Sequence, residues 1–171
     1  MVSGDMGELA EIIRQAVKLS GVRAVVALGW GQQEAKTKDT NIFYVKSVPH
    51  DWLFPHMAGA VHHGGAGTPA TSLRHALPTL VVPFGGDQPF WAERVYAAGC
   101  GPKAIPRDKL TAENLAEGLR ALISNPEYTR NAACIGEALR NEHGCANAAD
   151  LIEKAVWDWE NGNPAQDGMN I

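Results

Sequence analysis

The chain alternates short apolar runs with longer segments whose apolar side chains recur at helical spacing. Residues 5–19 carry apolar residues three or four positions apart, which predicts an amphipathic helix that stops at Ser20 and Gly21. The next apolar run, 24–28, is unbroken, as is typical of a parallel strand covered by helices on both faces. Further strands are predicted at 42–45, 58–61 and 79–82.

Helices are predicted after the third and fourth strands and through the last third of the chain. One follows the glycine-rich stretch and runs to His75, and another covers 87–98. A weak strand is expected at 100–105, after which Thr111 is a suitable N-cap for the next helix. Leu110 and Leu115 are spaced as a hydrophobic staple, and two more helices follow, opening at Pro126 and ending before Asn161.

Strands that alternate with helices predict an α/β fold with a Rossmann-like, doubly wound parallel sheet. The sequence predicts a single domain over residues 1–160 and a flexible tail over 161–171. In such sheets, ligands bind beyond the carboxyl ends of the strands. The stretches that follow predicted strands are 29–31, 49–54, 62–68 and 83–88.

Composition narrows the classes of function. The net charge of −4 provides no basic face for nucleic acid, so none is expected as a partner. The three cysteines form no C-x-x-C pair, and their odd number favours a reduced, cytoplasmic compartment. No segment reaches the roughly 18 apolar residues that would cross a bilayer, so any membrane contact is expected to be peripheral.

Residues 62–68, with the sequence HHGGAGT, are the most unusual stretch. Glycine costs about 1 kcal/mol against alanine in regular structure, so three glycines here indicate a close approach of backbone to another group. Bare N–H groups at a strand-to-helix turn form an anion site, although a tight turn without a ligand remains the alternative. A metal site is not expected, because no cysteine or carboxylate completes a tetrahedral set with His50, His56, His62 and His63.

Two further features lie at predicted strand ends. Asp87 and Gln88 offer adjacent acceptors and donors, which sugar hydroxyls require, while the alternative is that Asp87 caps the next helix. Trp30 and Trp52 are flat side chains on which a base could stack, while the alternative is that they pack in the core.

The stretch 48–95, which contains HHGGAGT and GDQPFW, resembles the donor-binding signature of family 1 glycosyltransferases. Residues 101–119 look most like the sterol 3-β-glucosyltransferase branch, and the resemblance covers roughly 21–155. It implies the carboxyl-terminal half of a GT-B fold, in which two Rossmann-like domains face each other across a cleft. It also implies inverting transfer from UDP-glucose, with no cofactor and no metal ion.

The resemblance also implies roles for individual residues. His63 would contact the diphosphate, Asp87 and Gln88 would bind glucose hydroxyls, and residues 48–53 would supply the uracil pocket. The turn residues that would hold phosphate oxygens are Gly65, Ala66, Gly67 and Thr68, and Trp52 is the aromatic candidate in the pocket. The chain departs from the family pattern at Pro69, at Thr71, where many plant relatives carry a ribose-binding glutamate, and at Gly85.

The family's catalytic base lies in its amino-terminal domain, so no catalytic residue is assigned here. A sterol or another hydrophobic acceptor would bind through that domain, which is expected to be missing. The family's donor domain opens with a strand, central in such sheets, that this sequence is expected to lack, leaving strands 24–28 and 58–61 without a common neighbour. Three interpretations stay open: a piece of a lipid glucosyltransferase, a donor-binding subunit of a split enzyme, and a non-catalytic or truncated nucleotide-sugar-binding module.

Overall fold

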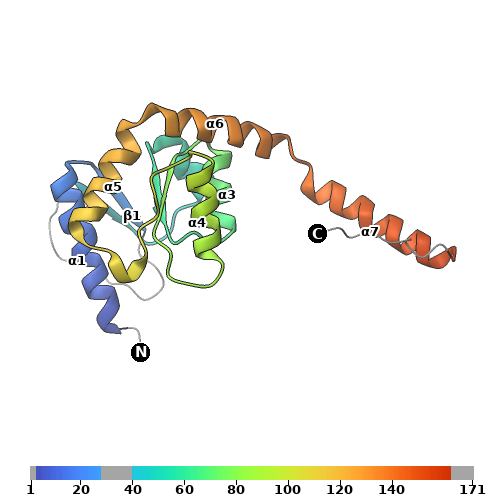
Figure 1. Ribbon diagram of the computed structural model, residues 1–171, viewed down its shortest axis with the longest axis horizontal. Coiled ribbons are helices and arrows are strands. Elements are labelled where there is room, and N and C mark those ends of the chain that lie inside the picture. The colour runs from blue at the N-terminus through green and yellow to red at the C-terminus, as the bar shows by residue number, and fades with distance from the viewer. Residues whose placement is uncertain (1–2, 28–39, 163–171) are drawn as a thin grey trace. The chain divides into compact units, whose positions relative to one another are not determined.

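The structure is a computed structural model that describes residues 3–27 and 40–162. Its elements are α1 Ser3–Ser20, β1 Ala24–Ala27, β2 Ile42–Val45, α2 His50–Leu53, η1 Phe54–His56, β3 Ala60–His62, α3 Gly67–Arg74, β4 Thr79–Val81, α4 Gln88–Ala97, η2 Arg107–Lys109, α5 Ala112–Ser124, α6 Pro126–Asn141 and α7 Gly144–Glu160 (Figure 1). The chain divides into two compact units, Met1–Leu139 and Arg140–Ile171. No described helix is long and apolar enough to cross a membrane.

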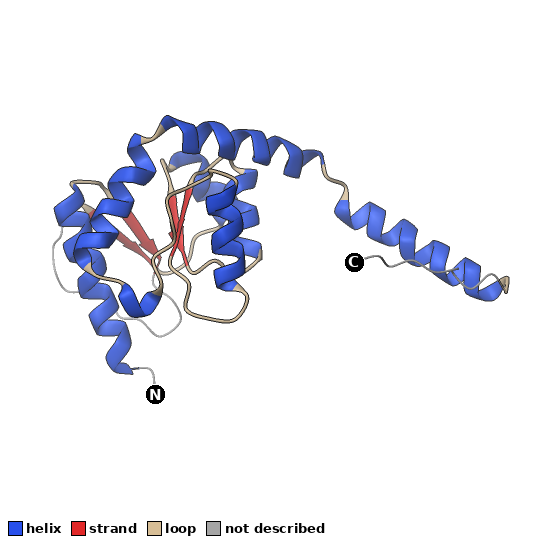
Figure 2. Cartoon of the chain, viewed as in Figure 1, coloured by secondary structure: helices blue, strands red, loops and turns tan. Residues whose placement is uncertain are grey.

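The described strands form two separate parallel pairs (Figure 2). β1 pairs with β2, with Ala24 opposite Ile42, and β3 pairs with β4, with Ala60 opposite Thr79. Within the described ranges no strand joins β1 to β3. The predicted parallel α/β architecture is therefore confirmed.

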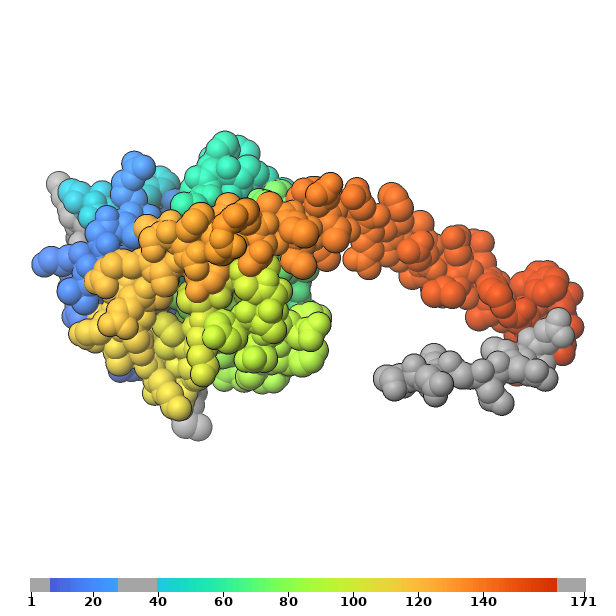
Figure 3. All heavy atoms as spheres, turned by 45° about the horizontal axis from the view of Figure 1, so that its top comes forward, coloured from blue at the N-terminus to red at the C-terminus, as the bar shows by residue number. Residues whose placement is uncertain are grey.

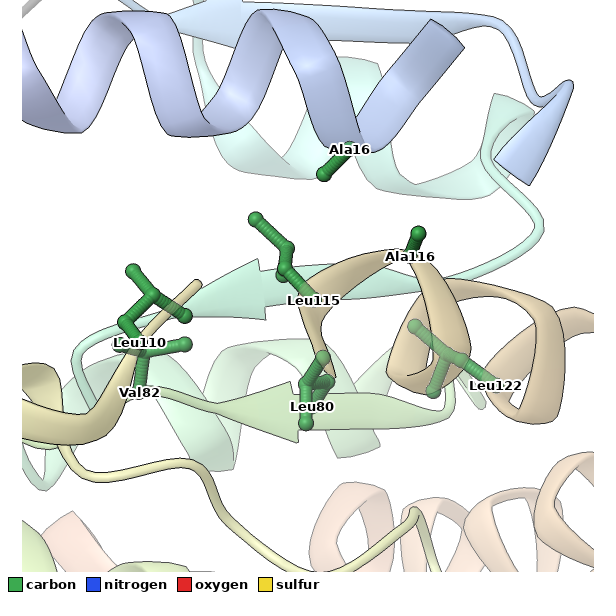
Figure 4. Close-up of a cluster of buried hydrophobic side chains, with 7 residues drawn as sticks. All are labelled: Ala16, Leu80, Val82, Leu110, Leu115, Ala116 and Leu122. Atoms are coloured by element: carbon green, nitrogen blue, oxygen red, sulfur yellow. The ribbon is translucent and has the colours of Figure 1, made fainter. Parts of the chain in front are cut away.

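Helices cover both faces of β4 because its side chains alternate between two apolar clusters. Leu80 lies in a cluster with Ala16 of α1 and with Leu115 of α5, and Figure 4 shows these side chains between the helices and the strand. Val81 lies in the opposite cluster, with residues of α3, α4 and α6. α1 packs along α5, as Figure 3 also shows in blue and yellow. This two-sided burial explains why the strand sequence has no polar alternation.

The N-terminus of α5 has the cap that the sequence predicted. The Thr111 hydroxyl accepts from the Asn114 N–H at 3.3 Å, and the Thr111 N–H donates to Asn114 Oδ1 at 2.9 Å. Leu110 and Leu115 are both buried in the α1–α5 cluster, as a hydrophobic staple would place them. The cap and the staple together fix where the chain enters α5.

The prediction of a weak strand at 100–105 is wrong. The segment bonds to the outer edge of β4, since the Thr79 N–H donates to the Cys100 carbonyl and the Ile105 N–H donates to the Val81 carbonyl. Pro102 lies between these bonds and has no N–H, so a regular ladder does not form. β3 also begins at Ala60, two residues later than predicted.

α7 forms most of the described part of the second unit, and the helix expected there is confirmed. Its large apolar side chains are all exposed: Leu151, Ile152, Val156, Trp157 and Trp159. Most of the predicted flexible tail, residues 163–171, lies outside the described residues.

Gly101→Ala should destabilise the fold, because a Cβ at this position would overlap the backbone carbonyl of Thr79. Overpacking of this kind costs about 1–3 kcal/mol of unfolding free energy. Gly7→Ala is the matched control, because Gly7 lies in α1 with no neighbouring atom within 4 Å of the added carbon. That change should raise the unfolding free energy by about 0.5–1 kcal/mol. Urea titrations followed by circular dichroism measure both, and a Gly101→Ala protein as stable as wild type would contradict the packing.

Candidate functional site

The turn after β3 and the loop after β4 lie together. Both strands run in the same direction and end at the same edge of their pair. A Cβ placed on Gly64, in the turn, would lie 3.4 Å from the backbone carbonyl oxygen of Gln88. The structure therefore brings together the two stretches that the sequence singled out, the HHGGAGT turn and the GDQ loop.

Gly64 has a conformation and surroundings that only glycine tolerates. Its φ is +88°, and a Cβ would come within 2.5 Å of Val81 Cγ1. The Gly64 N–H donates to His62 Nδ1 at 3.1 Å, which fixes the turn against the end of β3. The glycine is thus required by a close approach between this backbone and β4.

His63 and the start of α3 form the part of the site suited to an anion. The ring Nε2 of His63 lies 2.8 Å from the Cβ position of Gly65, so the ring covers the turn. The Thr68 N–H bonds to the Gly65 carbonyl at 2.9 Å, and α3 begins at Gly67 with no side-chain cap at Ala66. First-turn N–H groups without a side-chain cap and the positive helix end favour a negatively charged ligand.

Two hydroxyl groups of α3, those of Thr71 and Ser72, bond back to the helix backbone. Thr71 Oγ1 donates to the Gly67 carbonyl at 2.8 Å, and Ser72 Oγ donates to the Thr68 carbonyl at 3.0 Å. Thr71 stands where many plant members of the resembled family carry a ribose-binding glutamate. Its hydroxyl is engaged in the helix in this structure.

Gln88 and Asp87 have distinct local partners. Gln88 Oε1 accepts from the N–H groups of Phe84 at 2.7 Å and Gly85 at 3.2 Å, so its NH₂ group is the part that can donate to a ligand. Asp87 Oδ2 accepts from the Trp91 indole N–H at 2.9 Å. The alternative that the Asp87 side chain caps α4 is wrong, because it makes no bond to the helix backbone.

Trp52 is exposed over 64% of its surface, so the alternative of core packing is wrong for this residue. It lies on α2 and meets His56 edge to face at 5.5 Å. His50 stacks on buried Phe54 with ring centroids 4.6 Å apart, which fixes α2 against the fold. The other tryptophan singled out in the sequence, Trp30, lies in 28–39, outside the described residues.

One cavity connects several of these groups. It has a volume of about 560 Å³ and is lined, among other residues, by Val48, His50, His63 and Thr68. The predicted uracil segment and the anion-binding turn therefore contribute to the same space. Gln88 and Asp87 lie next to the turn but do not line this cavity.

His62 is a polar residue whose role the sequence did not reveal. Burial, with the neighbouring His63 and His50 adding to it, lowers its pKa from 6.5 to about 4. The ring is therefore neutral at pH 7, and because Nδ1 accepts from Gly64, the proton is on Nε2. This Nε2 is buried and finds no hydrogen-bond partner among the described residues. The sequence feature that could have indicated this buried role is the position of His62 at the end of an apolar strand.

Within the described ranges no group of three or more histidine, cysteine, aspartate or glutamate side chains could hold a metal ion. The candidate site brings together the backbone N–H groups of the turn, His63, Thr68 and the Asp87–Gln88 pair.

Comparison with known proteins identifies the family. A family model described as erythromycin biosynthesis protein CIII-like, C-terminal domain, matches residues 11–153. A sterol 3-beta-glucosyltransferase of Arabidopsis thaliana is 41% identical over 152 residues, which cover 88% of this chain. The chain spans 25% of that plant protein's length.

Solved glycosyltransferases share the fold. The structure of the glycosyltransferase VinC in complex with dTDP matches with a TM-score of 0.66 and 29% identity, over 75% of this chain and 33% of that one. A calicheamicin glycosyltransferase matches with a TM-score of 0.73 and 21% identity, over 85% and 39%. The predicted fold, that of the carboxyl-terminal half of GT-B glycosyltransferases, is confirmed.

The neutral state of His62 should make the fold sensitive to acid. Between pH 6.5 and about 4 the unfolded chain binds more protons than the folded one at this residue. The contribution of neutral His62 to the free energy of unfolding is therefore complete above pH 6.5. It decreases as the pH falls from 6.5 and is lost once the pH has fallen through about 4, at a cost of up to about 3 kcal/mol. His62→Asn keeps an acceptor for the Gly64 N–H but does not titrate. Urea titrations at several pH values should give a shallower acid loss for the variant, and parallel curves would exclude His62 as the cause.

Proposed function

The chain belongs to the family of erythromycin biosynthesis protein CIII-like C-terminal domains, and from this premise we propose that it binds the UDP-glucose donor of a glucosyltransferase. The observation that carries the proposal is the placement of the HHGGAGT turn beside the GDQ loop. The HHGGAGT turn offers hydrogen-bond donors for a diphosphate, and the GDQ loop offers donors and acceptors for sugar hydroxyls. The solved relative in complex with dTDP supports a nucleoside diphosphate as the ligand class.

In this proposal, His63, the amides of residues 65–68 and the N-terminus of α3 hold the diphosphate. Negative charge grows on this group as the bond to the sugar breaks. Preorganised N–H donors and a helix end stabilise such developing charge without a cofactor or a metal ion. The chain's contribution to transfer is therefore electrostatic stabilisation of the leaving group.

The sugar and the base would bind on either side of the diphosphate. The NH₂ group of Gln88 donates to a glucose hydroxyl, and Asp87 accepts from another through the oxygen that does not bond to Trp91. The uracil base of the donor lies against residues 48–53. In this segment Val48 and His50 line the cavity, and Trp52 presents an exposed ring. These contacts would orient the anomeric carbon towards the acceptor.

The acceptor in this proposal is a sterol or a similar hydrophobic molecule, as for the plant relative named above. Direct displacement with inversion needs a base that removes the proton of the acceptor hydroxyl. We assign no residue of this chain to that role, and place the base and the acceptor pocket on a partner domain. The chain would work on the cytoplasmic side, with membrane contact that is at most peripheral.

His63→Ala should weaken UDP binding by roughly five- to a hundredfold, because the lost hydrogen bond is worth about 1–3 kcal/mol. Isothermal titration calorimetry with UDP and with UDP-glucose measures the effect. His143→Ala is the control, since this exposed histidine lies outside the cavity-lining set and the turn. Equal affinities of the His63→Ala and wild-type proteins would remove His63 from the site.

The 171-residue chain alone should transfer no glucose to sterols, although it binds the donor. A general base typically contributes about 10²–10⁴-fold to rate, and the acceptor pocket is also assigned elsewhere. Labelled UDP-glucose with ergosterol or cholesterol is the assay. Formation of sterol glucoside at an enzymatic rate would show that the base lies within this chain.

A further inference from the structure

Trp91 contacts Asp87 through both its side chain and its backbone. The indole N–H donates to Asp87 Oδ2 at 2.9 Å. The backbone N–H of Trp91 donates to the Asp87 carbonyl at 3.3 Å, so the two residues are joined twice across the first turn of α4. The indole is partly buried and meets the Phe90 ring edge to face, with centroids 5.2 Å apart. These contacts restrict the indole and, through it, the carboxylate.

The backbone conformation of Asp87 explains why its carboxylate is available to Trp91. An aspartate that caps a helix with its side chain usually has an extended backbone. Asp87 instead has φ −79° and ψ −8°, and its side chain makes no bond to the α4 backbone. The carboxylate and the indole are four positions apart, so they lie on the same face of the helix. The second oxygen, Oδ1, accepts no hydrogen bond from the residues that the structure describes, and it is the oxygen left for a ligand.

The neighbouring side chain, Gln88, is held by a different anchor. Its Oε1 accepts from the N–H groups of Phe84 and Gly85, which leaves its NH₂ group for a ligand. Each of the two adjacent side chains therefore uses one polar atom as an anchor and keeps the other free. Because the free atoms are a donor on Gln88 and an acceptor on Asp87, the pair has a fixed polarity.

We propose that Trp91 is a positioning residue for the sugar of the donor, because its indole N–H holds the Asp87 carboxylate in the rotamer that offers Oδ1 to a sugar hydroxyl. This inference rests on the proposed function and extends it to a residue that acts through Asp87. Asp87 is exposed, so without the indole its side chain can take other rotamers, and sugar binding has to order it. A nucleoside diphosphate without a sugar makes no use of Asp87. Trp91 therefore affects the discrimination between UDP-glucose and UDP rather than the affinity for UDP.

The affinities for UDP-glucose and for UDP, measured by isothermal titration calorimetry on the 171-residue chain, test this role. Trp91→Phe removes the indole donor and keeps a flat apolar ring. It should raise the Kd of UDP-glucose about three- to tenfold and change the Kd of UDP less than about twofold. Asp87→Ala should raise the Kd of UDP-glucose at least as much. Adding Trp91→Phe to Asp87→Ala should then cause no further rise, because Trp91 acts through that carboxylate.

Phe90→Leu is the matched control for the calorimetry. It loses the edge contact with the indole ring but keeps the indole N–H and its acceptor, so the ratio of the two Kd values should stay that of wild type.

Exchange of the indole N–H with water tests the bond itself without any nucleotide. In a nuclear magnetic resonance spectrum of the isotope-labelled chain, the Trp91 indole signal is the one that Trp91→Phe removes. Asp87→Ala should speed its exchange at least about threefold, because the acceptor is lost. The indole N–H of Trp157, which is exposed on α7, should exchange at an unchanged rate.

The outcomes separate this inference from the proposed function. A wild-type chain that binds neither nucleotide would overturn the proposed function and, with it, the role of Trp91. Binding of both nucleotides with a wild-type ratio in Trp91→Phe would overturn the role of Trp91 alone. The same conclusion would follow from an equal further loss in the Asp87→Ala background, from a uniform loss of affinity for both nucleotides, or from indole exchange that Asp87→Ala does not change.

Discussion

Hydrogen bonding between the parallel strands β3 and β4 sets the arrangement on which the candidate site depends. Because the two strands share direction and register, the turn after one and the loop after the other must meet at the same edge. The Val82 N–H donates to the His62 carbonyl at 2.9 Å, and this bond brings the end of β4 to the first residue of the turn. Leu80 and Val81 are buried on opposite faces and hold this pair between two layers of helices. The pairing and packing of β4 therefore place the two loops that carry the candidate ligand-binding groups side by side.

Much of the fold follows from sequence because the relevant interactions are local. Apolar spacing predicted α1 and α5, and the Thr111 cap is confirmed in its backbone geometry. Glycine density at 64–67 predicted a backbone under close approach, and Gly64 with Val81 beneath it has this property. The order of the predicted elements along the chain was enough to predict that the turn lies at a strand end.

The parts that sequence did not predict depend on partners distant in space or on competing local bonds. Asp87 could have capped α4 or contacted a side chain, and the choice of the Trp91 indole depends on a rotamer that sequence does not reveal. Likewise, the side-chain oxygen of Gln88 accepts a hydrogen bond from its own loop. The neutral state of His62 comes from burial under neighbouring elements, and a strand at 100–105 fails because Pro102 lacks an N–H.

The distribution of the indole rings has a consequence for spectroscopy. Of the five tryptophans, Trp52, Trp157 and Trp159 are each exposed over more than half of their surface already in the folded chain. Their fluorescence is that of indoles in water, so unfolding changes their emission little. Trp91 is partly buried and bonded to Asp87, which makes it a built-in optical reporter of the GDQ loop. An emission change on adding a nucleotide sugar would thus report on Trp91 in the GDQ loop and on Trp52 beside the proposed base, rather than on the fold as a whole.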